Sequence, residues 1–322
     1  MSTLRDKVVV IYDPIRSIEW SYEPERSVLA EHGIRLVIPD DRAAAQAALP
    51  EADVVIVSTA IPGEDLELLT LRCRGIVCYS VGMDGVPAER ARELNIPVTN
   101  VAGYCTEDVA DHAIALMLAA QRELLHFATT SAAGDWDARN QPQLYRIRRL
   151  STQTVGVIGV GRIGSTVAQK ARGLGMATVG FDPFVTPTAH ADMRMVSMDQ
   201  LLAQSDVVIL CCLLNEQTRH IIDAEALAKM RPGSILVNVA RGGLVDEEAL
   251  IAALHDGPLR SAALDVREVE PARATGDPML EVPNVLLTQH VGATSVEAWE
   301  DIHRIASERV LELLSAKRED AA

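Results

Sequence analysis

The sequence predicts an α/β protein with parallel sheets, and three observations support this class. Short runs rich in Val and Ile, bounded by turn residues, alternate with Ala-, Leu- and Glu-rich stretches of helical periodicity. Such an alternation of strands and helices is typical of parallel sheets. The alternation occurs in two separate series, and a chain of 322 residues is long enough for two domains with their own cores. We therefore expect two doubly wound α/β domains.

The first series of strands occupies the N-terminal third of the chain. Four strands are expected to begin at Val8, Arg35, Val54 and Ile76, and a fifth lies in IPVTNVAGY near residue 100. The following stretch, from Thr106 to about Ala132, has the periodicity of one long helix, with acidic residues in its first turn. It separates the first series from the second.

The second series begins at Val155. Its first strand is TVGVIG, and the later ones lie in ATVGFD, DVVILCC, GSILVNV, RSAALDV and NVLLTQH. After His290, the segment TSVEAWEDIHRIASERVLELLSAK again has helical periodicity. We expect this helix to be the last ordered element.

Composition and charge restrict the class of partner. Apolar residues make up 48% of the chain and charged residues 23%, which is typical of folded domains. The formal net charge of -15 gives a field that repels nucleic acids and anionic lipids. The one basic cluster, Arg146, Arg148 and Arg149, fits either a solvated loop or a local binding patch. We expect neither a nucleic-acid nor a membrane partner, and no apolar run resembles a signal peptide or membrane span, which favours a cytoplasmic protein.

The cysteines indicate a reducing environment and no metal site. None of the CxxC spacings of zinc or redox sites occurs, and five cysteines cannot all pair with one another. Each is expected to be a small buried apolar residue and not a nucleophile. Because HExxH and EF-hand patterns are also missing from the sequence, we expect no metal.

A glycine-rich turn follows the first strand of the second series. In VGVIGVGRIG, Gly159, Gly161 and Gly164 have the spacing GxGxxG, which alone also occurs in ordinary turns. Here it lies between a strand and a helix, and a second strand ends at Asp182 about 20 residues further on. Such a unit binds a dinucleotide: the glycines permit the turn and the approach of the pyrophosphate, and the helix N-terminus holds its charge. Asp182, which could also be a turn residue before Pro183, would bind the ribose hydroxyls and favour NAD over NADP.

Three strand ends of the second series carry groups suited to catalysis. Arg241 follows VNVA, Asp265 and Glu270 lie in ALDVREVEP, and His290 follows VLLTQ. Taken singly, each could be a loop cation, a surface acid or a structural histidine. Because the carboxyl ends of parallel strands meet at one edge of a sheet, where ligands bind in doubly wound folds, together they predict an active site.

These stretches resemble the D-isomer-specific 2-hydroxyacid dehydrogenases over nearly the whole chain. The motifs that carry the resemblance are GVIGVGRIGSTVAQKARGLGM, NEQTRHIID, MRPGSILVNVARGGLVDEEAL, ALDVREVEP, TQHVGATS, VGMDGVPAERARELNIPVTNV and CTEDVADHAIALMLA. The resemblance implies a Rossmann-type NAD-binding domain, residues 102-290, inserted into a flavodoxin-like substrate domain, residues 1-101 and 291-322. It also implies a homodimer, with the helix beginning near Thr106 and the Trp136–Tyr145 loop as contacts.

The resemblance assigns a role to each candidate residue. Arg241 would hold the 2-oxo acid, a task suited to its planar guanidinium, and His290 would act as acid and base with Glu270 orienting its ring. The amides of Val81 and Gly82 would receive the substrate carboxylate. Residues implied to bind NAD are Gly159, Gly161, Arg162, Ile163, Gly164, Asp182, Ala240, Asp265 and Gly292.

Several positions depart from the family pattern. Gln289 replaces a common Pro before the histidine, Cys211–Leu214 replaces HxPL, and NVAG replaces NVPG. Cys78 stands where several relatives have a cation, which favours a substrate without a phosphate group. The substrate's side chain stays open, since Tyr79, Met83, Tyr104 and Trp299 fit either a pocket lining or ordinary packing.

A second class of function stays beside the enzyme. The segment YCTEDVADHA resembles the C-terminal-binding proteins, corepressors that share this fold and use NAD to control assembly. An NAD-sensing adaptor is therefore the alternative, although the acidic chain lacks the long tails expected of an adaptor. Reduction of 2-oxo acids with NADH separates the two.

Overall fold

The chain folds into two compact units, shown in a computed structural model that describes residues 4–13, 21–185, 193–270 and 276–316. Unit 1 comprises Met1–Tyr104 and Ser295–Ala322, and unit 2 comprises Cys105–Thr294. Each has one parallel sheet, as the sequence predicts. The predicted domain bounds, residues 1-101 with 291-322 for the substrate domain and 102-290 for the NAD-binding domain, stay a prediction.

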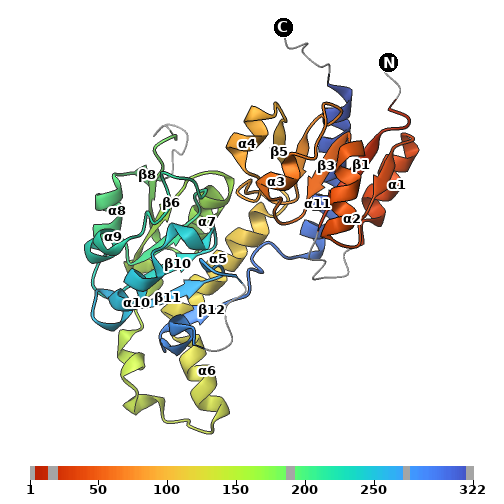
Figure 1. The fold of residues 1–322 in the computed structure, drawn as a ribbon. Helices are drawn as coiled ribbons and strands as arrows, with labels where there is room; N and C mark the ends of the chain where they lie inside the picture. The colour runs from red at the N-terminus through yellow and green to blue at the C-terminus, as the bar shows by residue number, and fades with distance from the viewer. Residues whose placement is uncertain (1–3, 14–20, 186–192, 271–275, 317–322) are drawn as a thin grey trace. The chain divides into compact units, whose positions relative to one another are not determined.

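Unit 1 contains a five-stranded parallel sheet of order β2-β1-β3-β4-β5 (Figure 1). Four strands begin where the sequence predicts, and Val98 opens the fifth. The strands are β1 (Val8–Tyr12), β2 (Arg35–Val37), β3 (Val54–Val57), β4 (Ile76–Cys78) and β5 (Val98–Asn100), and the helices are α1 (Glu23–Glu31), α2 (Arg42–Ala48), α3 (Gly63–Leu66), α4 (Ala88–Glu93) and α11 (Val296–Ser315). This strand order is that of flavodoxin-like folds.

Alternation of side chains along these strands produces two cores, one on each face. Val9 and Ile11 of β1 pack in a cluster with residues of α1 and α11. Val8, Val10 and Tyr12 pack in another with residues of α2, α3 and α4. The C-terminal helix thus completes the domain that begins at the N-terminus, since its apolar face covers this sheet.

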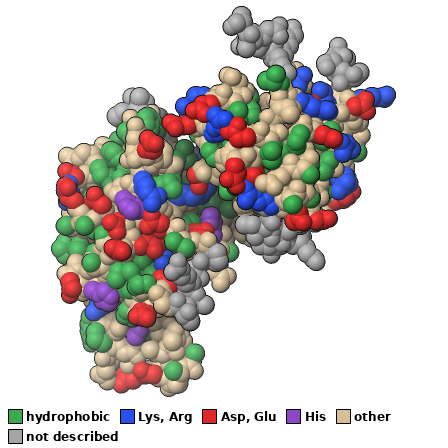
Figure 2. Space-filling model, viewed as in Figure 1, with side chains coloured by type: hydrophobic (Ala, Val, Ile, Leu, Met, Phe, Trp, Pro, Cys, Tyr) green, Lys and Arg blue, Asp and Glu red, His purple; other side chains and the backbone are tan. Residues whose placement is uncertain are grey.

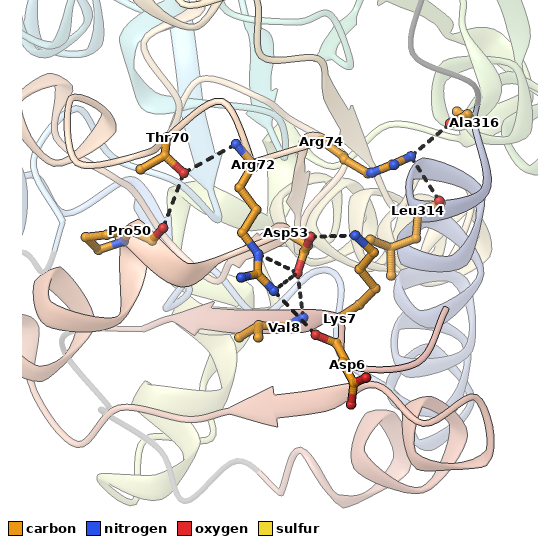
Figure 3. Close-up of polar contacts among 10 residues, drawn as sticks. All are labelled: Asp6, Lys7, Val8, Pro50, Asp53, Thr70, Arg72, Arg74, Leu314 and Ala316. Atoms are coloured by element: carbon orange, nitrogen blue, oxygen red, sulfur yellow. Dashed lines mark hydrogen bonds and ion pairs between the residues drawn. The ribbon is translucent and has the colours of Figure 1, made fainter. Parts of the chain in front are cut away.

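A buried carboxylate connects the amino ends of strands in unit 1 (Figure 3). Asp53 is fully buried and accepts hydrogen bonds from Lys7 Nζ at 3.0 Å, from the Val8 amide at 2.8 Å and from Arg72 Nη2 at 2.8 Å. Burial by itself would raise the pKa of Asp53, but these donors hold that pKa below its ordinary value. Arg74 donates to the carbonyl oxygens of Leu314 and Ala316, which are left unpaired at the end of α11.

Unit 2 contains a seven-stranded parallel sheet of order β12-β11-β10-β9-β6-β7-β8. Its strands are β6 (Thr154–Ile158), β7 (Ala177–Phe181), β8 (Arg194–Met195), β9 (Val207–Leu210), β10 (Ser234–Asn238), β11 (Leu259–Leu264) and β12 (Val285–Leu287), and its helices are α5 (Thr106–Gln121), α6 (Leu124–Ala132), α7 (Arg162–Gly173), α8 (Met198–Gln204), α9 (Ala224–Lys229) and α10 (Glu247–His255). α8, α9 and α10 pack on one face, and α5 and α7 contact each other and the strands of the other face. The direction of winding reverses between β6 and β9, which is where doubly wound folds bind ligands.

The predicted single helix from Thr106 to Ala132 is wrong. Helix α5 ends at Gln121 and α6 begins at Leu124, because Glu123 adopts the left-handed conformation with φ of 52°. Arg260 of β11 lies against this break: its Nη2 donates to Gln121 Oε1 at 3.1 Å and its Nε lies 3.8 Å from Glu123 Oε1. Contacts with a distant strand therefore accompany a break that local helix periodicity does not reveal.

Charge on the surface agrees with an acidic chain. Figure 2 shows acidic and basic side chains interspersed over the face in view, and Arg148 of the predicted basic cluster lies 3.4 Å from the carboxylate of Asp206. Among the described residues, no helix combines the length and apolar character needed to cross a membrane.

Candidate active site

The glycine-rich turn follows β6 at the point where the winding of unit 2 reverses. Gly159 has φ of +89°, and a Cβ added there would lie 2.5 Å from the Cys212 amide nitrogen after β9. A Cβ on Gly164 would lie 2.0 Å from the Gly159 carbonyl oxygen, whereas one on Gly161 would meet no heavy atom within 4 Å. The outer glycines thus permit tight packing, and the middle one borders open space.

The N-terminus of α7 and Asp182 complete this turn. No side chain of the described residues caps α7, so its first amides are available to an anion. Asp182, directly after β7, accepts from the Val160 amide and from the Phe184 amide, both at 2.9 Å. The carboxylate is therefore fixed beside the glycine turn, and the residues present fit the phosphates and ribose of a dinucleotide.

Three neighbouring strands bring the catalytic candidates to one edge of the sheet. Arg241 follows β10, Asp265 follows β11 and His290 follows β12, and these strands are adjacent in the order β12-β11-β10. The prediction that these groups lie at equivalent strand ends is confirmed.

His290 and Glu270 form a hydrogen-bonded pair. The Nδ1 of His290 lies 2.8 Å from Glu270 Oε2, and the two side chains are 47% and 36% exposed. The bond to Glu270 raises the pKa of His290 above its ordinary value, against burial and the charge of Arg241, which lower it. Burial alone would raise the pKa of Glu270, but the bonds from His290 and from the Arg267 amide, at 2.7 Å, lower it. The pair thus favours a charged imidazolium next to a carboxylate.

Asp265 organises the chain on both sides of His290. Its buried carboxylate accepts from Thr288 Oγ1 at 2.6 Å and from the amides of Val291 and Gly292 at 3.0 and 2.9 Å, and its carbonyl oxygen accepts from the His290 amide at 2.8 Å. Burial opposes the charge, yet bonds from His112, Thr288 and these amides hold the pKa of Asp265 far below its ordinary range. The loop from 288 to 292 is therefore wrapped around one carboxylate.

This wrapped loop holds His290 in an uncommon backbone conformation. His290 has φ of 55°, in the left-handed region that few residues other than glycine adopt. A Cβ on Gly292 would lie 2.9 Å from Asp265 Oδ2, so only glycine leaves room for the carboxylate. Backbone strain at His290 is balanced by the bonds to Asp265.

Sequence reasoning missed two supports of this site. His112 of α5 lies 3.2 Å from Asp265 Oδ1 and 3.1 Å from Thr288 Oγ1, and Arg267 is held by Glu247 and Asp277. A histidine directly before the apolar run AIALMLAA was the available signal for the first. Arg267 offered none, because its partners lie 20 and 10 residues away in the sequence.

The loop that carries Arg241 is packed tightly against the neighbouring strand end. A Cβ on Gly242 would lie 1.9 Å from the backbone carbon of Arg267. The side chain of Asn238 donates to the Arg241 carbonyl at 2.9 Å and accepts from the Ala240 amide at 3.0 Å. The Arg241 guanidinium lies close enough to lower the pKa of both Glu270 and His290. The Arg241 guanidinium and the His290 ring therefore lie in the same region of unit 2.

Val81 and Gly82 lie in a loop of unit 1, after β4. Ser80 Oγ donates to the Gly82 carbonyl at 2.5 Å, and Asn100 Nδ2 donates to the Val81 carbonyl at 2.6 Å. Within the described part of the chain, the amides of Val81 and Gly82 donate to no acceptor, although Gly82 is buried. Such amides suit an anionic ligand.

The cysteines and the pocket candidates divide between core and surface. Cys73, Cys78 and Cys105 are buried as predicted, whereas Cys211 and Cys212 are partly exposed after β9; none of the five forms a disulfide. Burial raises the pKa of Cys212 to about 11 and that of Cys78 to about 12, which disfavours a nucleophile.

Tyr79 belongs to the core of unit 1, with Tyr104 and Trp299 packed against it, and Met83 is 45% exposed. No cluster of metal-binding side chains occurs among the described residues.

Comparisons with known proteins define the class. The model of the D-isomer specific 2-hydroxyacid dehydrogenase NAD-binding domain matches residues 114–292. A hydroxypyruvate reductase of Thermotoga maritima is 36% identical over 78% of this chain and 81% of its own length. The structure of a D-lactate dehydrogenase from Aquifex aeolicus, complexed with NAD and lactic acid, has a TM-score of 0.82 and 26% identity over 95% of this chain and 94% of its own.

The chain belongs to the D-isomer-specific 2-hydroxyacid dehydrogenase family, and its unit 2 carries that family's NAD-binding domain. A D-3-phosphoglycerate dehydrogenase of Mycobacterium tuberculosis is 37% identical over 82% of this chain. The chain spans about half the length of the phosphoglycerate dehydrogenases that it matches.

Proposed function

We propose that the protein interconverts a 2-oxo acid and the corresponding D-2-hydroxy acid with NAD, using His290 as acid and base. The observation that carries the proposal is the 2.8 Å pair of His290 and Glu270, located beside Arg241 on adjacent strand ends of an NAD-binding unit. A bound nicotinamide dinucleotide would supply or accept the hydride. The protein's own task is to bind the acid and to move one proton.

The proton moves through one nitrogen of His290. Because Nδ1 faces Glu270, the ring keeps a proton there and Nε2 is left to act on the substrate. In reduction, Nε2 donates its proton to the carbonyl oxygen. In the reverse direction, Nε2 removes the hydroxyl proton, and the Glu270 carboxylate stabilises the resulting imidazolium.

The substrate carboxylate has two kinds of donor. The planar guanidinium of Arg241 forms paired hydrogen bonds to a carboxylate and an adjacent oxygen, and the amides of Val81 and Gly82 have no acceptor of their own within the described chain. We place Gly159, Gly161, Arg162, Ile163, Gly164 and Asp182 at the phosphates and ribose, and Ala240 and Gly292 nearer the nicotinamide. Asp265 fits a positioning role, because its carboxylate already accepts from several protein donors.

The substrate is expected to lack a phosphate group. Cys78 is buried, the loop that follows carries Asp84, and the next cation, Arg90, already pairs with Glu67 and Glu93. A phosphate there would meet an acidic group and no free cation of this loop. This expectation separates the protein from the phosphoglycerate dehydrogenases that it resembles.

We also propose a homodimer formed through unit 2. None of the residues of α6 is buried, and Leu124, Leu125, Trp136 and Tyr145 are 53%, 50%, 84% and 79% exposed. Figure 1 shows α6 projecting from the sheet of its own unit. Exposed apolar surface of this extent is typical of a protein interface, and a second copy would cover it.

The deciding experiment measures NADH oxidation with glyoxylate, hydroxypyruvate, bulkier 2-oxo acids and phosphohydroxypyruvate. We expect turnover of at least one unphosphorylated acid, loss of turnover in His290→Ala, and full activity in His255→Ala, a control on the exposed end of α10. NADH binding without turnover of any acid would contradict the proposed enzymatic function and favour the NAD-sensing adaptor. The dehydrogenases and reductases among the relatives do not favour that alternative.

A further inference from the structure

Three polar side chains that have no assigned role in the reaction meet inside unit 1. Glu25 comes from α1, Tyr79 follows β4, and His303 comes from α11. His303 Nδ1 lies 2.6 Å from the Tyr79 hydroxyl and 2.7 Å from Glu25 Oε1, and the Tyr79 hydroxyl also donates to Glu25 Oε1. Helices α1 and α11 lie against each other, so the three groups join the two helices to the end of a strand. We call them the Glu25 cluster.

The carboxylate of this cluster is buried and is bound by Tyr79 and His303. Glu25 is fully buried, and none of the described lysines or arginines forms an ion pair with it. Its second oxygen, Oε2, has no hydrogen-bond partner among the residues that the structure describes. A buried carboxylate costs free energy unless donors compensate it, so Tyr79 and His303 are held to it strongly.

Tyr79 keeps its proton and serves as a donor. Burial, followed by the charge of Glu25 and its hydrogen bond, raises the pKa of Tyr79 far above its ordinary value. The neighbouring Tyr22 ring packs edge-on at 6.2 Å and donates its own hydroxyl to Asp13 at 2.8 Å. Glu25, His303 and Tyr22 are thus titratable groups that contact Tyr79, and Asp13 is bound to Tyr22.

The cluster lies directly before the loop with the unpaired amides. Tyr79 is followed by Ser80, Val81 and Gly82, and its amide donates to the Val57 carbonyl of β3 at 2.9 Å. The backbone is thereby fixed by β3, and the side chain by α1 and α11. An anchor at this residue limits how the next amides can point.

We propose that Glu25, Tyr79 and His303 are positioning residues that hold the amides of Val81 and Gly82 for the substrate carboxylate. The inference rests on the proposed function, which places the carboxylate at these amides. It assigns the cluster to substrate affinity, whereas proton transfer belongs to His290.

The test compares two tyrosines that each donate to a buried carboxylate in unit 1. Tyr79→Phe removes the hydroxyl bound to Glu25, and Tyr12→Phe removes the one bound to Asp65, in the core on the opposite face of the sheet. We expect Tyr79→Phe to raise KM for the oxo acid about tenfold, the effect of one lost hydrogen bond, with kcat and KM for NADH within about twofold. Both variants should lower Tm by similar amounts, because each loses one buried hydrogen bond. Tyr12→Phe should leave KM for the oxo acid unchanged.

Hydrogen exchange of the Tyr79 and Val101 amides, which donate to the Val57 and Ser80 carbonyls on either side of this loop, gives a readout that needs no turnover. Exchange of these amides should be faster in Tyr79→Phe and in Glu25→Gln than in the wild type and in Tyr12→Phe. Unchanged exchange, or faster exchange with an unchanged KM, would overturn the inference. If wild-type protein reduces no oxo acid but exchange responds as stated, the proposed function fails while the anchoring of the loop stands.

Discussion

At the scale of single residues, the carboxylate of Asp182 is expected to select the cofactor. It is fixed by the amides of Val160 and Phe184, so its charge stays beside the ribose position of the glycine turn. A 2′-phosphate next to this charge is repelled, and NADH should be strongly preferred over NADPH. Asp182→Ala should narrow the ratio of the two kcat/KM values by about one to two orders of magnitude. Equal use of both cofactors by the wild type would show that Asp182 does not select the nucleotide.

Arg241 is assigned by the shape of its side chain as well as by its charge. Lysine keeps the charge but loses the planar fork, so Arg241→Lys should raise KM for the oxo acid and lower kcat. The expected cost in kcat/KM is about 2 to 4 kcal/mol. Steady-state kinetics close to those of the wild type would place the substrate anchor elsewhere.

The loop around Asp265 is the element that presents His290. Asp265→Asn replaces one accepting oxygen by a donor, which then faces the Val291 or Gly292 amide or His112. We expect kcat to fall by at least about tenfold and the free energy of unfolding to fall by about 2 kcal/mol. Asp53→Asn, an equally buried aspartate in unit 1, is the control: it should destabilise the protein and leave kcat unchanged.

The pKa of Asp265 also predicts how stability depends on pH. Because this pKa is depressed below 3.8, the stabilisation is complete above that value and is lost as pH falls below it. The difference in unfolding free energy between wild type and Asp265→Asn should therefore shrink on acidification. A constant difference between pH 7 and about pH 2 would contradict the charged state assigned to Asp265.

The elements themselves show what sequence patterns can and cannot predict. Buried strands such as Val8–Tyr12 and Val54–Val57 start where the runs of Val and Ile start, since burial on both faces requires continuous apolar runs. The break at Glu123 and the two-residue strand β8 are not visible in this way. Both depend on contacts with distant segments.

The candidate site also has features that the sequence predicts and features that it does not. Arg241, Asp265 and His290 could be placed together because strand ends share an edge of the sheet. Three features could not be predicted in this way: the left-handed backbone of His290, the contact of His112 with Asp265, and the Glu25 cluster. Each depends on contacts between residues far apart in the sequence.

At the scale of the whole molecule, the proposed dimer accounts for the apolar surface of α6 and the segment after it. Light scattering should give twice the chain mass of 34.8 kDa. Trp136→Asp with Leu125→Asp should shift the protein towards the monomer, because two charges would be buried at the interface. Leu71→Asp, at an 88% exposed position of unit 1, is the control and should leave the mass unchanged. A monomeric mass for the wild type would contradict the proposed dimer.

The central claim is that His290 and Glu270 act together as the acid and base, and pH profiles test it most directly. Glu270 raises the pKa of His290, so kcat/KM for reduction should fall as pH rises through this pKa, and kcat/KM for oxidation should fall as pH drops through it. Glu270→Gln keeps most of the shape but removes the charge, and the ring should then lose its proton at lower pH. The measurement is kcat/KM in both directions for wild type and Glu270→Gln, with a deuterated cofactor to show that hydride transfer limits the rate. A reduction limb displaced to more acidic pH is the predicted result, and an unmoved limb would contradict the pairing and leave Glu270 a structural acid.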